Sequence, residues 1–486
     1  MPDSQVSPVV KWSCFIVATI LLAYTGYRAY SLSFTHDESL TYNYMVHNSI
    51  MDIISNNTSY ISANNHILNT LFMKAFEGVL GNSEFSLRLQ SLIAHCLYLL
   101  FTFKLLKGTG SKTAVLCGFL LLNVNPYLLD FFSLARGYAM AITFMIMSIW
   151  YFAAFIKAGK HGYLVASFIA ACLSVLSNFA LLNYLAVLFI MYEAYLFYEY
   201  KPLKTAFKII LRKNVVVFIT LAIMLAICYE PIRILRQANQ FYFGGEKGFW
   251  DDTVGTLIDT FLYHQSYNGI VSIVQVIVAI VPCLLIVTLF YNGARKKWDV
   301  ASTHGLLFIS TLLLIIAVCT AQHILLGTKF LEERYALFLV PLFIFVVIFF
   351  LSIIAGREKA IKLPALILLV ALSGASVYHF SRTANLSFTY NWEYDAATKR
   401  MLNDLASEAA KSQEKKTTLG ITWLYEPSIN FYRVTKNLDW LTPVDRSGPD
   451  GDYDFYYVEN LTSLNAQRNI IKEYPVTHSY LLKKIK

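Results

Sequence analysis

Long apolar runs separated by short polar turns fill most of this chain of 486 residues. A helix needs about 20 mainly apolar residues to cross a bilayer, and runs near this length recur as far as residue 380, so the pattern predicts roughly eleven transmembrane helices. Their expected positions are residues 12–31, 88–106, 113–130, 138–156, 163–178, 180–198, 214–229, 270–291, 304–322, 335–355 and 363–380.

Three polar segments interrupt or follow these runs. The first loop, residues 32–87, contains two stretches with helical periodicity, 40–54 and 66–80, which are too polar to span and suited to the membrane interface. A second loop runs from residue 230 to about 269. The tail, residues 381–486, is the only part with the composition of a soluble protein.

The tail alternates between helical and strand-like patterns. We expect a helix over 395–411, strands at 418–424, 438–441 and 453–458, a helix near 464–474 and a final strand near 478–482. The predicted fold is therefore an all-α polytopic membrane domain over residues 1–380, followed by a small soluble α/β domain over 381–486.

The composition is also typical of a membrane protein. It is 56% hydrophobic and only 15% charged, whereas soluble domains carry about 25% charged residues. This excludes an ordinary cytosolic enzyme, a disordered protein and a disulfide-stapled secreted module. The seven cysteines lie in apolar stretches without metal-ligand spacing. The absence of Walker, Rossmann and metalloprotease motifs argues against an ATP-driven pump and a soluble nucleotide-sugar enzyme.

The net charge of +9 records topology and does not indicate a nucleic-acid partner. Lysine and arginine collect in alternate loops, at residues 107–112, 157–160, 201–213, 295–297 and 357–362. The positive-inside rule makes these loops cytoplasmic, which places the N-terminus inside and the tail outside. The opposite face receives nearly all the acids of the membrane region: Asp37, Glu38, Asp52, Glu77, Glu84, Asp130, Glu230, Asp251, Asp252, Asp259, Glu332 and Glu333. We therefore look for chemistry on that external face.

The sharpest motif is Thr35-His36-Asp37-Glu38, where the first apolar run ends. Adjacent carboxylates beside a bilayer repel each other and lose solvation, so they persist more easily when a metal, a cationic ligand or a catalytic task stabilises them. The alternative is a solvated loop start with incidental acids.

A second motif places arginine in short external turns. Arg136 is followed by Gly137, which allows close backbone approach, and a planar guanidinium at the membrane surface is suited to binding phosphate. The alternative is an arginine that snorkels to the headgroups. Glu333-Arg334 repeats the situation at a later run, where the alternative is an internal Glu–Arg pair.

A third motif, Asn64-Asn65-His66, opens the second interfacial stretch. A histidine here could orient a sugar hydroxyl, assist a carboxylate or bind a metal. The alternative is a capped helix start in contact with lipid headgroups.

In this order the motifs resemble those of the GT-C glycosyltransferases, the superfamily of the protein O-mannosyltransferases and the lipid A aminoarabinose transferase. The resemblance covers about the first 380 residues and is strongest to the bacterial integral-membrane branch. It rests on His36-Asp37-Glu38 for the acidic first-loop motif, Asn65-His66-Ile67-Leu68 with Phe85-Ser86-Leu87-Arg88-Leu89 for N-H-P-L … F-x-L-R-L, Ala135-Arg136-Gly137-Tyr138 for A-R-x-Y, and Glu333-Arg334-Tyr335 for E-R-Y. Ile67 departs from the usual proline.

The resemblance implies an enzyme of the inner (plasma) membrane that moves a hexose or pentose from a polyprenyl-phosphate donor to a hydroxyl of a glycan, lipid or protein, with inversion. The tail would be periplasmic. The implied catalytic residues are Asp37, as base, and Glu38; the implied substrate-binding residues are His66, Arg136, Tyr138, Glu333 and Arg334. No cofactor is certain, and a divalent metal at Asp37, Glu38 and His66 is left open, because relatives differ.

Two other functions would suit a polytopic, aromatic-rich chain. A flippase or transporter of lipid-linked oligosaccharides is expected to show ionisable residues near mid-bilayer or an internal duplication, and we find neither. An O-antigen polymerase or ligase uses similar donors, but its large external loop would come late in the chain. Here the acidic motif follows the first run.

Overall fold

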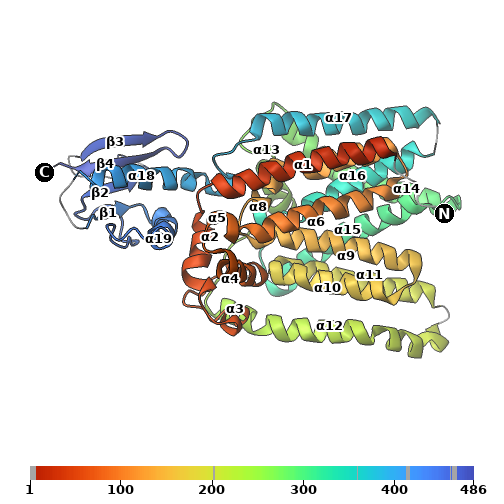
Figure 1. The fold of residues 1–486 in the computed structure, drawn as a ribbon. Helices are drawn as coiled ribbons and strands as arrows, with labels where there is room; N and C mark the ends of the chain where they lie inside the picture. The colour runs from red at the N-terminus through yellow and green to blue at the C-terminus, as the bar shows by residue number, and fades with distance from the viewer. Residues whose placement is uncertain are drawn as a thin grey trace.

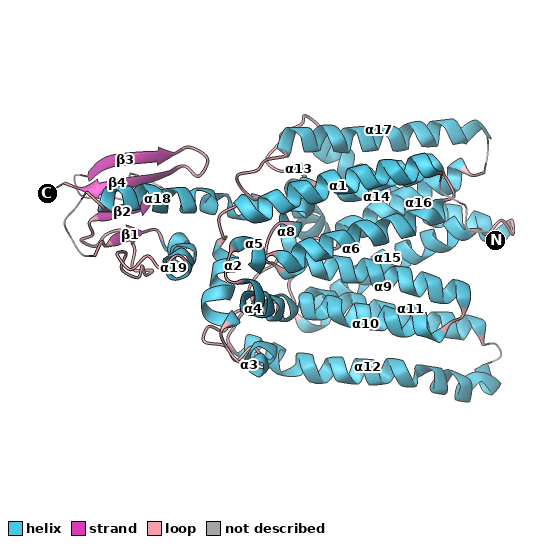
Figure 2. Cartoon of the chain, in the orientation of Figure 1, coloured by secondary structure: helices cyan, strands magenta, loops and turns pink. Residues whose placement is uncertain are grey.

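A bundle of helices and a smaller unit of mixed structure make up the computed structural model. It describes residues 7–200, 203–357, 359–411, 416–459, 461 and 468–485. Figure 1 shows the helices of the bundle lying side by side, with the C-terminal part at one end. Figure 2 shows that the described strands all belong to that part.

The bundle follows the apolar runs of the sequence. Its helices are α1 (Pro8–Ser31), α6 (Leu89–Leu106), α7 (Lys112–Asn123), α8 (Pro126–Phe132), α9 (Gly137–Ala158), α10 (His161–Ser177), α11 (Leu182–Glu199), α12 (Leu203–Gln237), α14 (Ile270–Ala294), α15 (Val300–Leu326), α16 (Leu339–Ala355) and α17 (Lys359–Thr383).

The expected count of eleven spans is not confirmed. Eight helices among the described residues are long and apolar enough to cross a membrane, or nine if α7 and α8 form one span. These two helices are bent by 67°, because Pro126 begins α8 and Asn125 caps it. Helices α10 and α16 reach only 17 residues each.

The first loop folds into short helices that cover one end of the bundle. They are α2 (His36–Thr41), the π-helical turn η1 (Tyr42–Val46), α3 (Ile50–Ser55), α4 (Ile67–Leu80) and α5 (Glu84–Leu87). The expected helix over 66–80 is confirmed as α4, while the one over 40–54 is interrupted before Ser49, which caps α3. The second loop contributes the π-helical turn η4 (Phe249–Gly255) and α13 (Thr256–Leu262).

The direction of the helices places the acidic motif and the basic turns at opposite ends of the bundle. Helices α6 and α9 directly follow their N-cap residues Arg88 and Arg136, which both contact the Asp37-Glu38 turn. They end at Leu106 and Ala158, beside the lysine turns that follow. These basic turns therefore lie at one end of the bundle and the acidic motif lies at the other. We call the end with the acidic motif the site end.

The C-terminal unit, residues 384–485, mixes helices and strands as expected. It contains the 3₁₀ turns η6 (Tyr390–Ala397) and η7 (Trp423–Tyr425), helices α18 (Thr398–Ala409) and α19 (Glu426–Thr435), and strands β1 (Leu419–Ile421), β2 (Phe455–Val458), β3 (Arg468–Tyr474) and β4 (Ser479–Lys484). The sheet order is β1-β2-β4-β3, with β1 and β2 parallel and the other pairs antiparallel.

Two local predictions in this unit are wrong. The expected helix near 464–474 is strand β3 from Arg468 onward, because its residues pair with β4; positions 464–467 lie outside the described residues. The expected strand at 438–441 makes only an isolated bridge, from Leu441 to Thr417. Helix α19, just before it, was not predicted. Strand formation depends on pairing with another segment, which the periodicity of the segment itself does not reveal.

The C-terminal unit and the first loop share one hydrophobic core at the site end. Phe34 stacks on Phe431 of α19 at 4.1 Å between ring centroids, and Tyr42 packs edge-on against the same ring. Met73 of α4 and Leu87 of α5 complete this core from the bundle side. The C-terminal unit is thereby fixed over the acidic motif.

Candidate functional site

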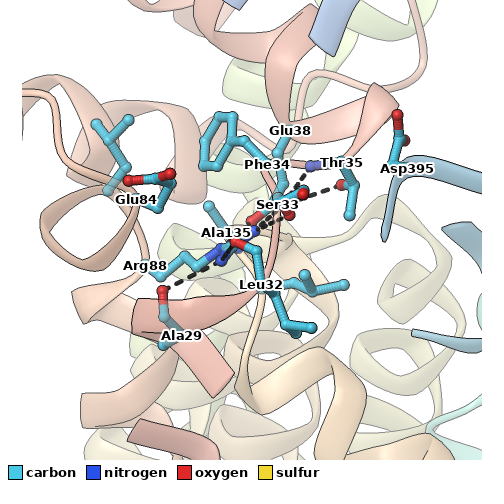
Figure 3. Close-up of polar contacts among 12 residues, drawn as sticks. Ala29, Leu32, Ser33, Phe34, Thr35, Glu38, Glu84, Arg88, Ala135 and Asp395 are labelled. Atoms are coloured by element: carbon cyan, nitrogen blue, oxygen red, sulfur yellow. Dashed lines mark hydrogen bonds and ion pairs between the residues drawn. The ribbon is translucent and has the colours of Figure 1, made fainter. Parts of the chain in front are cut away.

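A buried arginine fixes the turn that leaves α1. Arg88 places Nε 2.8 Å from Oε1 of Glu38 and Nη2 2.7 Å from Oε2, so the two side chains form a bidentate pair (Figure 3). Its guanidinium also donates to the carbonyls of Ala29, Leu32 and Ser33. Neither charged side chain has any exposed surface. The pair therefore holds the end of α1, the loop start and α6 together.

Two further residues, Thr35 and Ala135, occupy the Glu38 carboxylate. Oε2 accepts a hydrogen bond from the backbone N–H of Thr35, which closes a capping box at α2. Oε1 accepts one from the backbone N–H of Ala135, in the turn before α9. Because both oxygens are bound inside the protein, Glu38 joins two turns of the site and does not face it.

Asp37 points the other way, toward two arginines. Its Oδ2 lies 3.4 Å from Nη2 of Arg136 and 3.8 Å from Nη2 of Arg334. Burial raises the pKa of Asp37, but attraction from Arg136 and then Arg334 outweighs it and lowers the pKa to about 2. The carboxylate is therefore ionised at neutral pH, and it keeps 12% of its side chain exposed.

Arg136 lies at the N-cap of α9 and is held by the first loop. Nη2 donates to Oδ1 of Asn64 at 2.6 Å and lies 3.1 Å from Nε2 of His66. Burial, reinforced by the charge of Arg136, lowers the pKa of His66 well below its usual value, so this imidazole is neutral and accepts from the guanidinium. The Arg136 side chain is only 1% exposed. The snorkelling alternative is therefore wrong.

Gly137 makes this arrangement possible. A Cβ at this position would lie 2.0 Å from the carbonyl oxygen of Ser177 and 2.7 Å from Cβ of His66. The start of α9 can therefore approach the end of α10 and the histidine only without a side chain.

Arg334 belongs to the 3₁₀ turn η5 (Glu333–Ala336) and is framed by aromatic rings. Its guanidinium carbon lies 5.2 Å from the ring centroid of Trp392 and 5.3 Å from that of Tyr335. Glu333 instead accepts from Nδ2 of Asn391 at 3.1 Å. The ion pair that the structure shows for Arg334 is thus with Asp37, and the alternative of an internal Glu–Arg pair is not what is found.

Tyr138 completes the wall of the site. Its ring lies 4.9 Å from that of His66 and 6.2 Å from that of Tyr335, and the side chain is buried. The structure thus brings five of the seven predicted site residues together: Asp37, His66, Arg136, Tyr138 and Arg334. Glu38 and Glu333 lie beside this group but turn to Arg88 and Asn391.

Sequence reasoning missed several residues that shape the site. Arg88 was visible only as part of the F-x-L-R-L resemblance, and Asn64 only as a neighbour of His66. Trp392 reaches Arg334 from the C-terminal unit, and nothing in the sequence connects the two. Asp130, one of the acids that the sequence places on the external face, pairs with Arg28 at 2.6 Å, and both side chains are almost fully buried.

The donor set does not fit a divalent cation. Asp37 faces two guanidinium groups, the oxygens of Glu38 are bound by Arg88, and Nε2 of His66 faces Arg136. No group of three or more His, Cys, Asp or Glu side chains in the described part of the chain is placed to hold a metal ion. Two arginines around one carboxylate leave positive charge that suits an anion.

Comparison with known proteins identifies the fold. No protein-family model and no curated protein matches the sequence. Among solved structures, ArnT from Cupriavidus metallidurans in the apo state matches with a TM-score of 0.53 and 9% identity over 99% of each chain. The same protein bound to undecaprenyl phosphate matches with a TM-score of 0.50 and 9% identity over 97% of each chain. The expected helical membrane fold with a small C-terminal domain is confirmed, and it is similar to the fold of ArnT along nearly the whole chain.

Proposed function

We propose that this protein is a membrane-embedded glycosyltransferase that moves a sugar from a polyprenyl-phosphate donor to an acceptor hydroxyl. The observation that carries the proposal is the ionised Asp37 carboxylate beside the buried Arg136 and the less enclosed Arg334. The fold supports it, because one of the two ArnT structures that it resembles is bound to undecaprenyl phosphate.

The proposal includes a location and a division of the chain. Residues 1–380 form the membrane unit and residues 381–486 an external, periplasmic domain of an inner (plasma) membrane protein. The basic turns at the far end of the bundle support a cytoplasmic position for that end and for the N-terminus. The site then opens on the outer face, where a lipid-borne phosphate can reach it while its chain stays in the bilayer.

In the proposed reaction Arg136 and Arg334 bind the donor phosphate. The acceptor oxygen attacks the anomeric carbon, the bond from that carbon to the phosphate oxygen breaks, and its electron pair leaves with the polyprenyl phosphate. Asp37 takes the acceptor proton, for which its carboxylate must come within about 3 Å of the hydroxyl. A single displacement of this kind inverts the configuration. The arginines stabilise the charge that develops on the departing phosphate.

Donor binding would also strengthen the base. Asp37 is a weak base while two guanidinium groups hold its pKa at about 2. A donor phosphate that pairs with Arg136 and Arg334 competes for these positive charges, so the pKa of Asp37 rises toward its ordinary value. His66 and Tyr138 keep Arg136 in place, Glu333 positions the Arg334 turn, and Glu38 positions the loop.

Replacement of Asp37 tests the proposed base. We expect Asp37→Asn to lower sugar transfer on the order of 10²- to 10⁴-fold, while binding of undecaprenyl phosphate is retained. The assay is release of undecaprenyl phosphate from a panel of undecaprenyl-phosphate-linked sugars by the purified protein, which also reports whether a hexose or a pentose moves. Near-normal turnover by this variant would remove Asp37 as base.

Replacement of Arg136 tests the phosphate site separately. Arg136→Ala should chiefly weaken binding of undecaprenyl phosphate. The matched control is Arg233→Ala, because Arg233 is exposed on α12 and pairs with Glu230 outside the site. Equal binding by the two variants would contradict a phosphate role for Arg136.

A further inference from the structure

Exposed aromatic side chains lead from the site across the first loop to the C-terminal unit. Tyr242 is 56% exposed, Tyr60 40% and Trp423 51%, and Tyr44 is partly buried. We call these four residues, together with Arg446, the aromatic track. Its members come from the second loop, the first loop and the C-terminal unit, so no local sequence pattern reveals it.

The inner end of the track lies near the site that contains Asp37 and Arg334. The ring of Phe243 lies 5.8 Å from that of Tyr335 and 4.2 Å from that of Tyr242. The pKa of Tyr242 is raised, first by partial burial and then by its neighbours Tyr335, Tyr60 and Asp37. Through Phe243 the second loop thus reaches Tyr335, the neighbour of Arg334, and Tyr242 lies close enough to Tyr60 and Asp37 for their charges to act on its hydroxyl.

The outer end is continuous with the C-terminal unit. Tyr44 lies 5.6 Å from Tyr60 between ring centroids, and its hydroxyl donates to Oε1 of Glu426 at 3.2 Å. Nε of Arg446 lies 3.2 Å from Oε2 of the same carboxylate. The guanidinium carbon of Arg446 in turn lies 5.8 Å from the ring centroid of Trp423.

The segment that carries Tyr242 is fixed in place. Gly245 and Phe330 exchange two backbone hydrogen bonds, of 3.1 and 2.9 Å. A Cβ at Gly245 would lie 2.0 Å from the carboxyl carbon of Asp252, and one at Gly244, where φ is +120°, would lie 2.5 Å from the carbonyl oxygen of Phe330. Two glycines thus let the segment lie close against the η5 side of the site, so its rings form a preorganised surface.

We infer that the aromatic track binds the acceptor and that this acceptor is a saccharide chain. The inference rests on the proposed function. An aromatic face packs against the C–H face of a sugar ring, and the guanidinium of Arg446, whose side chain is 39% exposed, can donate hydrogen bonds to hydroxyls. Four rings from three segments offer more contact than one sugar unit can cover, which favours a chain that ends with its hydroxyl at Asp37.

A peptide acceptor fits the same surface less well. Extended peptides commonly bind by adding a strand to an exposed sheet edge. The edge strand nearest Trp423 is β1, and its residues Leu419–Ile421 are all buried. The open groups of the track are therefore side-chain rings and charges, without a free strand edge beside them.

Binding of immobilised oligosaccharides by the purified full chain tests the inference. The probes are bacterial cell-envelope oligosaccharides freed of lipid, with Ser/Thr-rich peptides as the competing class. We expect the wild type to bind at least one oligosaccharide. Trp423→Ala and Tyr60→Ala should each weaken this binding about tenfold, which corresponds to ~1.4 kcal/mol. Trp423→Phe should retain most of the binding. Trp250→Ala is the matched control, because Trp250 is exposed in the second loop outside the track.

Each result decides the question. Loss of oligosaccharide binding in the two alanine variants, with the Trp250→Ala control unchanged, supports the track. A wild type that binds only peptides or no oligosaccharide, or alanine variants that bind as the wild type does, overturns it. Undecaprenyl phosphate binding in the same preparations reports on the donor alone: failure of the wild type to bind it refutes the proposed function, whatever the saccharides do.

Discussion

Asp37 and Glu38 are adjacent in sequence but serve different purposes in the structure. Glu38 is fully buried in a bidentate pair with Arg88, whereas Asp37 keeps part of its side chain exposed beside two arginines. A buried ion pair repays its desolvation only when further hydrogen bonds satisfy both partners. The contacts of Glu38 with Thr35 and Ala135 meet that requirement, so this pair fixes the loop from which Asp37 projects.

Removal of Arg88 should therefore destabilise the protein. Arg88→Ala leaves the buried Glu38 carboxylate without its counter-charge, which costs about 3–5 kcal/mol. Arg88→Lys should recover only part of this, because an ammonium cannot reproduce the bidentate geometry. Thermal unfolding of the detergent-solubilised protein measures both effects. Arg233→Ala on the exposed α12 pair is the control, and an equal midpoint for Arg88→Ala and Arg233→Ala would contradict the assignment.

The residues of the site could be predicted to different degrees. Asp37, His66 and Arg136 stand in motifs whose order and common face indicated one site, and the structure brings them together. The partner of each arginine could not be predicted, because it depends on contacts between segments far apart in the chain. Arg88 pairs with a residue fifty positions away, and Arg334 lies on Trp392 of the C-terminal unit.

At the scale of elements, close approach of α9 and α10 supports the site. Gly137→Ala should displace the start of α9, because the new Cβ would lie 2.0 Å from a backbone oxygen of α10. We expect weaker binding of undecaprenyl phosphate and a lower unfolding midpoint. Gly162→Ala is the control, since Gly162 lies in α10 with nothing within 4 Å of an added Cβ. Matching behaviour of the two variants would show that this contact is dispensable.

Helices were easier to predict than their breaks and the strands. The apolar run over 113–130 predicted one span, but Pro126 and the cap at Asn125 divide it into α7 and α8. Helix α4 followed the periodicity directly, since one of its faces packs on the bundle. Strand β3 did not, because its conformation is selected by pairing with β4. The local pattern therefore predicted the helix whose buried face follows its own periodicity. It failed for the strand whose conformation depends on pairing with another strand.

At the scale of the whole molecule, the C-terminal unit holds the loop that carries Asp37. Asp395 accepts a hydrogen bond from the backbone N–H of His36 at 2.6 Å, and Nδ1 of His36 lies 2.7 Å from the carbonyl oxygen of Leu424. Both contacts touch the residue next to Asp37. The position of the proposed base therefore depends on residues that follow the last helix of the bundle.

The linkage through Asp395 predicts a pH-dependent stability. Burial raises the pKa of Asp395 to about 8. The hydrogen bonds from Ser428 and His36 oppose this rise, and the nearby negative charges of Asp37 and Glu38 add to it. An unfolded aspartate titrates near pH ~3.9. Between these values the folded protein binds the extra proton, so the free energy of unfolding falls as pH rises from about 4 to about 8, by at most ~1.4 kcal/mol per pH unit.

Asp395→Asn should remove this dependence. The Ser428 hydroxyl lies 2.7 Å from Oδ1 of Asp395 and 3.2 Å from the carbonyl oxygen of Tyr425, so it can accept from a protonated acid, or from an amide, while it donates to that carbonyl. Unfolding midpoints measured from pH 5 to pH 9 should decline for the wild type up to about pH 8 and change less for the variant. Parallel profiles would mean that Asp395 is already ionised in the folded protein, and the C-terminal unit would then hold the loop through a charge and not through a neutral acid.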